Sequence, residues 1–180
     1  MKPWKTLTRS VILDHSKFLT VENHTVELPD GRIIKDWPWV ITPNFANIVA
    51  MTEDDQFLCF RQTKYAIEDS TLAVVGGYLE PDEEPMAAAQ RELHEETGYE
   101  ATDWIDLGHY PVDGNRGAGV AHMYLARGAH HVAAPHADDL EEQELLTLSR
   151  DGLQVAYASG QFKILSHVAC VALALLWLGK

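Results

Sequence analysis

The most constraining feature of this sequence is a set of glycine and charged residues at fixed spacing within residues 77–99. A glycine is followed after five residues by a glutamate, and after seven more by the run RELHEETGY. Pro85 suits the first turn of a helix, and Gly98 suits the position just after its end. The spacing therefore predicts a helix over residues 84–97.

Three glutamates of this predicted helix fall on one face. At about 100° per residue, Glu92, Glu95 and Glu96 lie within one arc of about 100°. Carboxylates this close repel one another unless a cation lies between them, and hard oxygen ligands select Mg²⁺ or Mn²⁺. An isolated acidic face is usually a solvated surface, but the flanking glycine pair and the fixed spacing favour a metal site here. A neighbouring apolar stripe is expected to pack on a sheet: Met86, Ala89 and Leu93.

The whole stretch resembles the Nudix box, G-x5-E-x7-R-E-U-x-E-E-x-G-U, the signature of the Nudix hydrolases. Every charged position and both glycines match, and Tyr99 replaces the usual aliphatic residue in the last position. The resemblance implies an α/β fold, the Nudix α/β/α sandwich with a mixed sheet, preceded by a small N-terminal β extension. It implies hydrolysis of a diphosphate bond in a nucleoside-diphosphate-X substrate.

The resemblance also implies individual roles for residues in and around the box. Four groups are expected to bind the metal: the Gly76 carbonyl and the carboxylates of Glu92, Glu95 and Glu96. Four residues are expected to shape the box: Gly77, Glu83, Arg91 and Gly98, with Glu83 as the partner of Arg91 rather than a ligand. The candidates for the base that activates water are Glu95, Glu96, Glu141 and Glu142, and the last two are not separable because both lie in one acidic run. That run has a surface loop as its alternative interpretation.

The chain is expected to divide into an N-terminal β extension, residues 1–42, and a Nudix hydrolase domain, residues 43–180. Strand-like stretches fill the first part, with a Pro-Asp-Gly turn at residues 29–31. They resemble the N-terminal extension of ADP-ribose pyrophosphatase-like Nudix proteins. In that subfamily the extension often reaches across a dimer and helps to form the substrate pocket, so the resemblance implies a homodimer.

Four residues are candidates for substrate binding. Arg61 and Arg116 resemble family arginines near the substrate, the second within a glycine-rich stretch, and Trp37 or Trp39 is suited to stacking on a nucleobase. The alternatives are a surface ion pair for Arg61, a simple turn around Arg116, and packing or interface roles for the tryptophans.

Composition narrows the class of partner. The chain has 14 basic and 27 acidic residues and a net charge of −13, so a nucleic-acid partner is not expected. The apolar run over residues 164–178 is shorter than a membrane span, and the first residues do not have the pattern of a secretory signal. Cys59 and Cys170 lie in apolar surroundings and are expected to be buried free thiols. Together these features predict a cytoplasmic protein without a membrane partner.

The sequence thus predicts a Mg²⁺- or Mn²⁺-dependent hydrolase of a small nucleoside diphosphate derivative, with ADP-ribose or a nucleotide sugar as the first candidate. Within enzymes, the alternatives are another dinucleotide, a coenzyme or a nucleoside triphosphate, because the box defines the diphosphate chemistry and not the leaving group. Outside enzymes, the alternative is a non-catalytic sensor of a nucleotide sugar, a class that often loses box acids.

Overall fold

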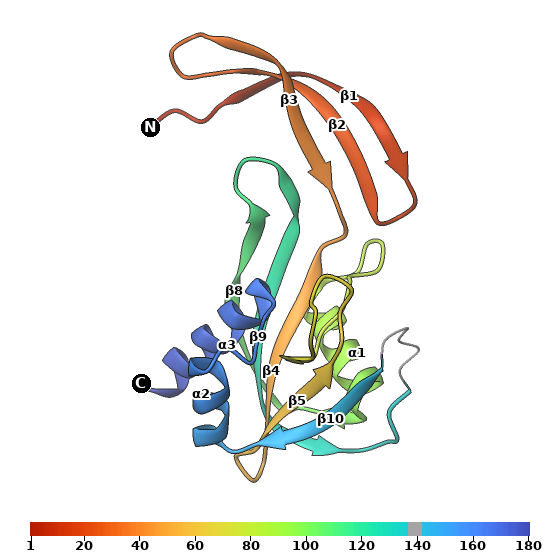
Figure 1. Ribbon diagram of the computed structural model, residues 1–180, viewed down its shortest axis with the longest axis vertical. Coiled ribbons are helices and arrows are strands. Elements are labelled where there is room, and N and C mark those ends of the chain that lie inside the picture. The colour runs from red at the N-terminus through yellow and green to blue at the C-terminus, as the bar shows by residue number, and fades with distance from the viewer. Residues whose placement is uncertain (137–141) are drawn as a thin grey trace. The chain divides into compact units, whose positions relative to one another are not determined.

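A computed structural model of the chain describes residues 1–136 and 142–180. The described chain forms two compact units, of which the first comprises residues 1–44 and 110–121. Its first three strands pair in sequence as an antiparallel meander (Figure 1): β1 (Lys5–His15), β2 (Leu19–Glu27) and β3 (Ile33–Ile41). A single parallel pair, Val40 with Gly117, adds the beginning of β9 to this sheet.

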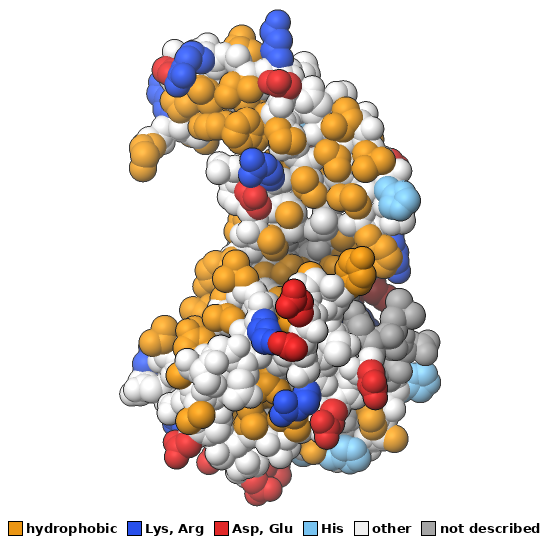
Figure 2. All heavy atoms as spheres, in the orientation of Figure 1, with side chains coloured by type: hydrophobic (Ala, Val, Ile, Leu, Met, Phe, Trp, Pro, Cys, Tyr) orange, Lys and Arg blue, Asp and Glu red, His pale blue; other side chains and the backbone are white. Residues whose placement is uncertain are grey.

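The first unit buries little of its own surface. Within residues 1–44, only His24 and Val26 are buried. Every residue of β1 is exposed, including Val11 and Ile12 at 58% and 65%, and apolar side chains cover much of the visible surface of β1–β3 (Figure 2). A small sheet with so few buried residues is marginally stable by itself.

The second unit comprises residues 45–109 and 122–180. Its central strands follow the order β9-β4-β5-β10, with β6 beside β5, and with β7 and β8 beside β9. The bounds of these strands are β4 (Phe45–Thr52), β5 (Phe57–Gln62), β6 (Thr71–Ala73), β7 (Tyr99–Glu100), β8 (Asp103–Asp113), β9 (Gly117–His131) and β10 (Gln143–Leu148). Strands β8 and β9 therefore contribute to both units.

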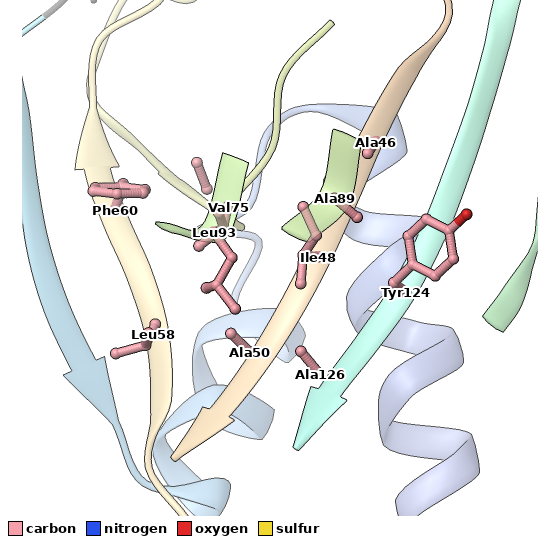
Figure 3. Packing of buried hydrophobic residues seen from close by; sticks show 11 residues of the cluster. Ala46, Ile48, Ala50, Leu58, Phe60, Val75, Ala89, Leu93, Tyr124 and Ala126 are labelled. Atoms are coloured by element: carbon pink, nitrogen blue, oxygen red, sulfur yellow. The ribbon is translucent and has the colours of Figure 1, made fainter. Parts of the chain in front are cut away.

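Helices lie on both faces of the sheet in the second unit. They are α1 (Pro85–Thr97), α2 (Arg150–Ala158) and α3 (Leu165–Leu178). Alternate side chains of β4, Ala46, Ile48 and Ala50, pack with Ala89 and Leu93 of α1 in one buried cluster (Figure 3). The residue between the first two, Asn47, accepts a hydrogen bond at its carbonyl from the Cys170 thiol of α3, 3.4 Å away. With α1 packed on one face of β4 and α3 on the other, the second unit has helices on both sides of a mixed sheet, in α/β/α layers.

The helices confirm most of the boundaries that the sequence indicates. Helix α1 follows the prediction to within one residue, and α2 begins after Ser149, whose Oγ accepts the Gly152 N–H at 3.1 Å. The apolar character of residues 162–178 predicts a last helix that starts at residue 162, and this start is wrong, because α3 begins at Leu165. Phe162 instead forms a parallel bridge with Leu72, which holds the preceding backbone extended.

The glycines and the proline of residues 111–119 predict a loop over this whole stretch, and the loop in the structure is shorter. Strand β8 continues to Asp113 and β9 begins at Gly117, so three residues connect them. Gly117 has φ +83, and a Cβ on it would meet the indole ring of Trp39 at 2.8 Å. Glycine therefore lets the backbone of β9 pass close to this aromatic side chain.

Both cysteines belong to the second unit, and the expectation that they are buried free thiols is confirmed. Cys59 and Cys170 are free and buried, and burial raises the pKa of each thiol to about 12. Among residues 1–136 and 142–180, no helix has both the length and the apolar character needed to cross a bilayer.

Candidate active site

Helix α1 carries the charged residues of the box and has well-defined ends. Pro85 occupies its first turn, where a missing N–H costs nothing. Gly98 ends it with φ +73, and its N–H donates to the His94 carbonyl at 2.8 Å. A side chain at this position would collide with the Ala133 carbonyl, so glycine is needed both for the left-handed turn and for the close approach of the following chain.

Arg91 forms hydrogen bonds with several residues of the box. Its guanidinium binds Glu83 in a bidentate pair, with Nε to Oε1 at 2.8 Å and Nη2 to Oε2 at 2.9 Å. Its Nη1 donates to Glu92 at 2.8 Å and to Glu95 at 3.0 Å, and Nη2 also reaches the Tyr78 carbonyl at 3.2 Å. The hydrogen bonds from Arg91 hold the pKa of Glu83 below its usual value. The arginine thus ties the loop before α1 to two carboxylates on the helix.

Gly76 and Gly77, at the start of the box, place their backbone against the carboxylates of α1. Gly76 donates its N–H to Oε2 of Glu96 at 3.0 Å, and it has φ +155, with the Ala46 carbonyl where a Cβ would stand. A Cβ on Gly77 would collide with the carboxylate of Glu92. The loop itself is held by backbone pairing with β4, through Ala46 N–H to the Gly77 carbonyl at 2.9 Å. Both glycines are therefore required for the loop to lie against the helix.

The site carries an excess of negative charge that suits a divalent cation. Four carboxylates gather around the Arg91 guanidinium and the Gly76 N–H: Glu83, Glu92, Glu95 and Glu96. The side chains of Glu83 and Glu92 are only 15% and 12% exposed, so water screens their charge poorly.

The carboxylate and carbonyl oxygens of the site fit Mg²⁺ or Mn²⁺. In the described residues, however, these oxygens are not arranged around a common point as metal ligands. Among residues 1–136 and 142–180, no three His, Cys, Asp or Glu side chains are grouped as a metal site, and Arg91 binds both Glu92 and Glu95. Hard cations take carboxylate and carbonyl oxygens. The residues that would hold such an ion are Glu92, Glu95 and Glu96, and Gly76 lies directly beside the last of them.

The C-terminal end of α1 is joined to the chain that precedes the acidic run. Val132 and Ala133 both donate to the Gly98 carbonyl, at 2.8 and 3.2 Å, and His136 donates to the Glu95 carbonyl at 2.8 Å. Glu142 is exposed just before β10, whereas Glu141 lies outside the described residues.

Two of the four substrate-binding candidates have clear packing roles. Trp37 donates its indole N–H to the Asn115 carbonyl at 2.8 Å. Trp39 stacks on the His24 ring with centroids 5.5 Å apart. Stacking of a nucleobase on Trp37 or Trp39 stays a prediction.

The two arginine candidates are both exposed. Arg61 lies on β5 with Glu144 at 4.0 Å, and Arg116 lies 3.6 Å from Asp113. Arg61 belongs to the second unit, and Arg116 belongs to the first unit together with Trp37 and Trp39.

Tyr78 is a further contact residue of the box, and the box pattern itself assigns it no role. Its carbonyl accepts from Arg91, and its ring meets Phe45 edge to face with centroids 6.5 Å apart. Its position directly after the glycine pair was the available signal. The contacts of Arg91 with Glu92 and Glu95 do not follow from the sequence either, because the resemblance assigns those carboxylates to the metal.

A glycine loop packed on a carboxylate-bearing helix, within an α/β/α fold, defines the class of Nudix pyrophosphohydrolases. Comparison with known proteins agrees with this class. Residues 42–165 match the family model of the NUDIX domain, so the chain belongs to the NUDIX domain family. Residues 4–40 match a second model, the nucleoside diphosphate sugar hydrolase N-terminal domain.

Individual relatives align with different shares of the chain. A CMP-5'-(N-acetyl-N-hydroxy-3-aminopropyl)phosphonate hydrolase of Streptomyces rubellomurinus is 31% identical over 168 residues, which are 93% of this chain and 80% of the relative. An ADP-ribose pyrophosphatase of Bacillus subtilis is 29% identical over 122 residues, 68% of this chain and 65% of the relative. A solved structure of an ADP compounds hydrolase has a TM-score of 0.82 at 19% identity and covers 99% of this chain and 96% of its own; at that identity it supports the fold alone.

Proposed function

We propose that this protein hydrolyses the diphosphate bond of a nucleoside diphosphate joined to a second group, with ADP-ribose or a nucleotide sugar as the preferred substrate and Mg²⁺ or Mn²⁺ as the cofactor. The observation that carries this proposal is the intact box: Arg91 orders three neighbouring carboxylates, and the Gly76 N–H orders a fourth, on Glu96. The substrate is suggested by the ADP-ribose pyrophosphatase relative and by the match of residues 4–40 to a nucleoside diphosphate sugar hydrolase domain.

The proposed reaction needs a bound cation, an ordered set of carboxylates and a proton acceptor. Glu92, Glu95 and Glu96 would hold the cation, which would supply positive charge for the diphosphate oxygens and would make water more acidic. Arg91 keeps these carboxylates gathered through its contacts with Glu83 and the helix. Glu95, Glu96, Glu141 or Glu142 accepts the proton of the attacking water on a carboxylate oxygen.

A second candidate substrate is a CMP-linked phosphonate. The relative named for such a substrate aligns with 93% of this chain, whereas the ADP-ribose pyrophosphatase aligns with 68%. The remaining alternatives are another dinucleotide, a coenzyme, a nucleoside triphosphate, or a sensor that binds a nucleotide sugar without hydrolysing it. The sensor is disfavoured because every box acid is present.

We also propose that the protein functions as a homodimer. The exposed apolar side chains of β1 and the sparse core of residues 1–44 support a partner surface over this unit.

A substrate panel tests the proposed activity. Phosphate-ester release should be measured with ADP-ribose, nucleotide sugars, a CMP-linked phosphonate, dinucleotides and triphosphates, each in Mg²⁺ and in EDTA. Mg²⁺-dependent turnover concentrated on ADP-ribose or a nucleotide sugar supports the proposal, and turnover concentrated on the phosphonate supports the second candidate. Tight binding of one compound without turnover of any would replace the hydrolase with the sensor.

A further inference from the structure

Two histidines stack across neighbouring strands outside the box. The rings of His109 on β8 and His122 on β9 have centroids 5.9 Å apart and planes 29° apart. Both residues belong to the second unit, and His109 is exposed while His122 is partly buried. Neither ring takes part in the box contacts described above.

The strands explain why these side chains share a face. Trp104 of β8 meets Tyr124 of β9 edge to face with centroids 6.3 Å apart, and Tyr124 borders the core beneath α1 (Figure 3). Since side chains alternate along a strand, His122 lies on the face of Tyr124, two residues away, and Asp106 lies on the face of Trp104.

An irregularity at Gly108 brings His109 onto that same face. Residues 106 and 109 are an odd number apart, so regular alternation would separate them. Gly108 has φ +111, and its N–H donates to Oδ1 of Asp106 at 2.7 Å. A residue with positive φ inside a strand shifts the alternation by one position, as in a β-bulge. His109 therefore meets His122 across the strands.

Electrostatic coupling supports this grouping. Burial and the neighbouring His109 lower the pKa of His122, and the carboxylate of Asp106 acts in the opposite direction. Burial raises the pKa of Tyr124, and Asp106 adds to this effect. A carboxylate that acts on both β9 side chains lies close to them, where it also attracts cations.

We propose that His109 and His122 form a binding site for a first-row divalent transition metal, distinct from the carboxylates of the box. Each imidazole offers one ring nitrogen after rotation about its side-chain torsions, and water completes the coordination. Imidazole suits Cu²⁺, Ni²⁺ and Zn²⁺, whereas carboxylate and carbonyl oxygens suit Mg²⁺ and Mn²⁺. No third His, Cys, Asp or Glu ligand joins the pair within residues 1–136 and 142–180, so affinity should follow the order Cu²⁺ above Ni²⁺ and Zn²⁺.

A Cu²⁺ titration of the full chain tests this site independently of the proposed activity. Excess Mg²⁺ in the buffer occupies oxygen ligands, and electron paramagnetic resonance distinguishes nitrogen from oxygen donors. The wild-type protein should bind one Cu²⁺ with a two-nitrogen signature. The variant His109→Gln should weaken binding about tenfold or more, because one of two protein ligands is lost.

The matched control is His15→Gln, which removes an exposed imidazole from β1 and should leave Cu²⁺ binding unchanged. His109 is exposed, so its loss is not expected to disturb folding, and circular dichroism checks this. A His122→Gln variant should reproduce the loss from the other strand. Equal affinity and an unchanged nitrogen signature in His109→Gln, or an oxygen-only signature in the wild-type protein, would overturn the proposal.

Discussion

Glu96 combines a structural contact with a proposed chemical role, and one substitution separates the two. Glu96→Gln keeps an oxygen that can accept the Gly76 N–H, 3.0 Å from Oε2 in the structure, but removes the charge needed to hold a cation. We expect kcat to fall by about 100-fold or more while the urea unfolding midpoint stays near the wild-type value. Glu100→Gln, an exposed change just beyond α1, is the control. Turnover of Glu96→Gln at the wild-type rate would remove Glu96 from the proposed metal site.

A substitution at Gly77 tests whether the loop before α1 must lie against this helix. In Gly77→Ala, the new Cβ would collide with the carboxylate of Glu92, so either the loop or the glutamate must move. We expect a lower unfolding midpoint and a loss of Mg²⁺-dependent activity, measured by urea titration and by initial rates.

The control for this change is Gly114→Ala, because a Cβ there meets nothing within 4 Å. That variant should keep wild-type stability and activity. If Gly77→Ala were as active as Gly114→Ala, close packing of the loop on Glu92 would not be required for function.

At the scale of elements, the buried His167 of α3 makes the free energy of unfolding depend on pH. Its ring Nδ1 is buried and has no hydrogen-bond partner among the described residues. Burial, reinforced by the positive charge of Lys64, lowers its pKa from 6.5 to about 4. Above pH 6.5 the ring is neutral in both folded and unfolded chains. As the pH falls from 6.5 towards 4, the unfolded chain binds the proton first, so the free energy of unfolding decreases.

This linkage predicts a specific effect of His167→Leu. The wild-type protein should lose about 2 kcal/mol of unfolding free energy from this residue between pH 7 and pH 5, and the leucine variant should not. Urea unfolding at both pH values measures the difference, with His15→Leu on exposed β1 as the control. Parallel pH profiles of the wild-type protein and His167→Leu would show that the ring is protonated equally in both states.

The elements differ in how far the sequence predicts them. Helix α1 was predictable because its start, its end and its apolar stripe are all local signals, from Pro85 to Gly98. The start of α3 was not, because the backbone at Phe162 is held by a bridge to Leu72, ninety residues away in sequence. Long-range pairing of this kind leaves no local pattern.

The site shows the same division between local and distant signals. The face shared by Glu92, Glu95 and Glu96 follows from helical periodicity alone. The sequence does not show that Arg91 contacts two of these glutamates directly, since that depends on side-chain conformations. Likewise, the meeting of His109 with His122 depends on positive φ at Gly108 and on the register of two strands.

At the scale of the whole molecule, the exposed apolar strand β1 leads to a prediction about assembly. If a second copy covers this unit, Ile12→Asp should place a charge in the interface and shift a dimer towards monomer, measured by size-exclusion chromatography with light scattering. Val155→Asp is the control, because Val155 in the second unit is 64% exposed and Ile12 is 65% exposed. A dimer that persists in Ile12→Asp would place the interface elsewhere, and a monomeric wild-type protein would refute the homodimer.

We propose that water attacks a diphosphate bond at the box and that this reaction depends on a metal ion. The most direct measurement is product analysis of ADP-ribose hydrolysis in ¹⁸O-labelled water, with Mg²⁺ and with EDTA. We predict equal amounts of AMP and ribose 5-phosphate, ¹⁸O in the phosphate of one product, and neither product in EDTA. Products that arise at the same rate in EDTA, or cleavage at a bond outside the diphosphate, would contradict the account.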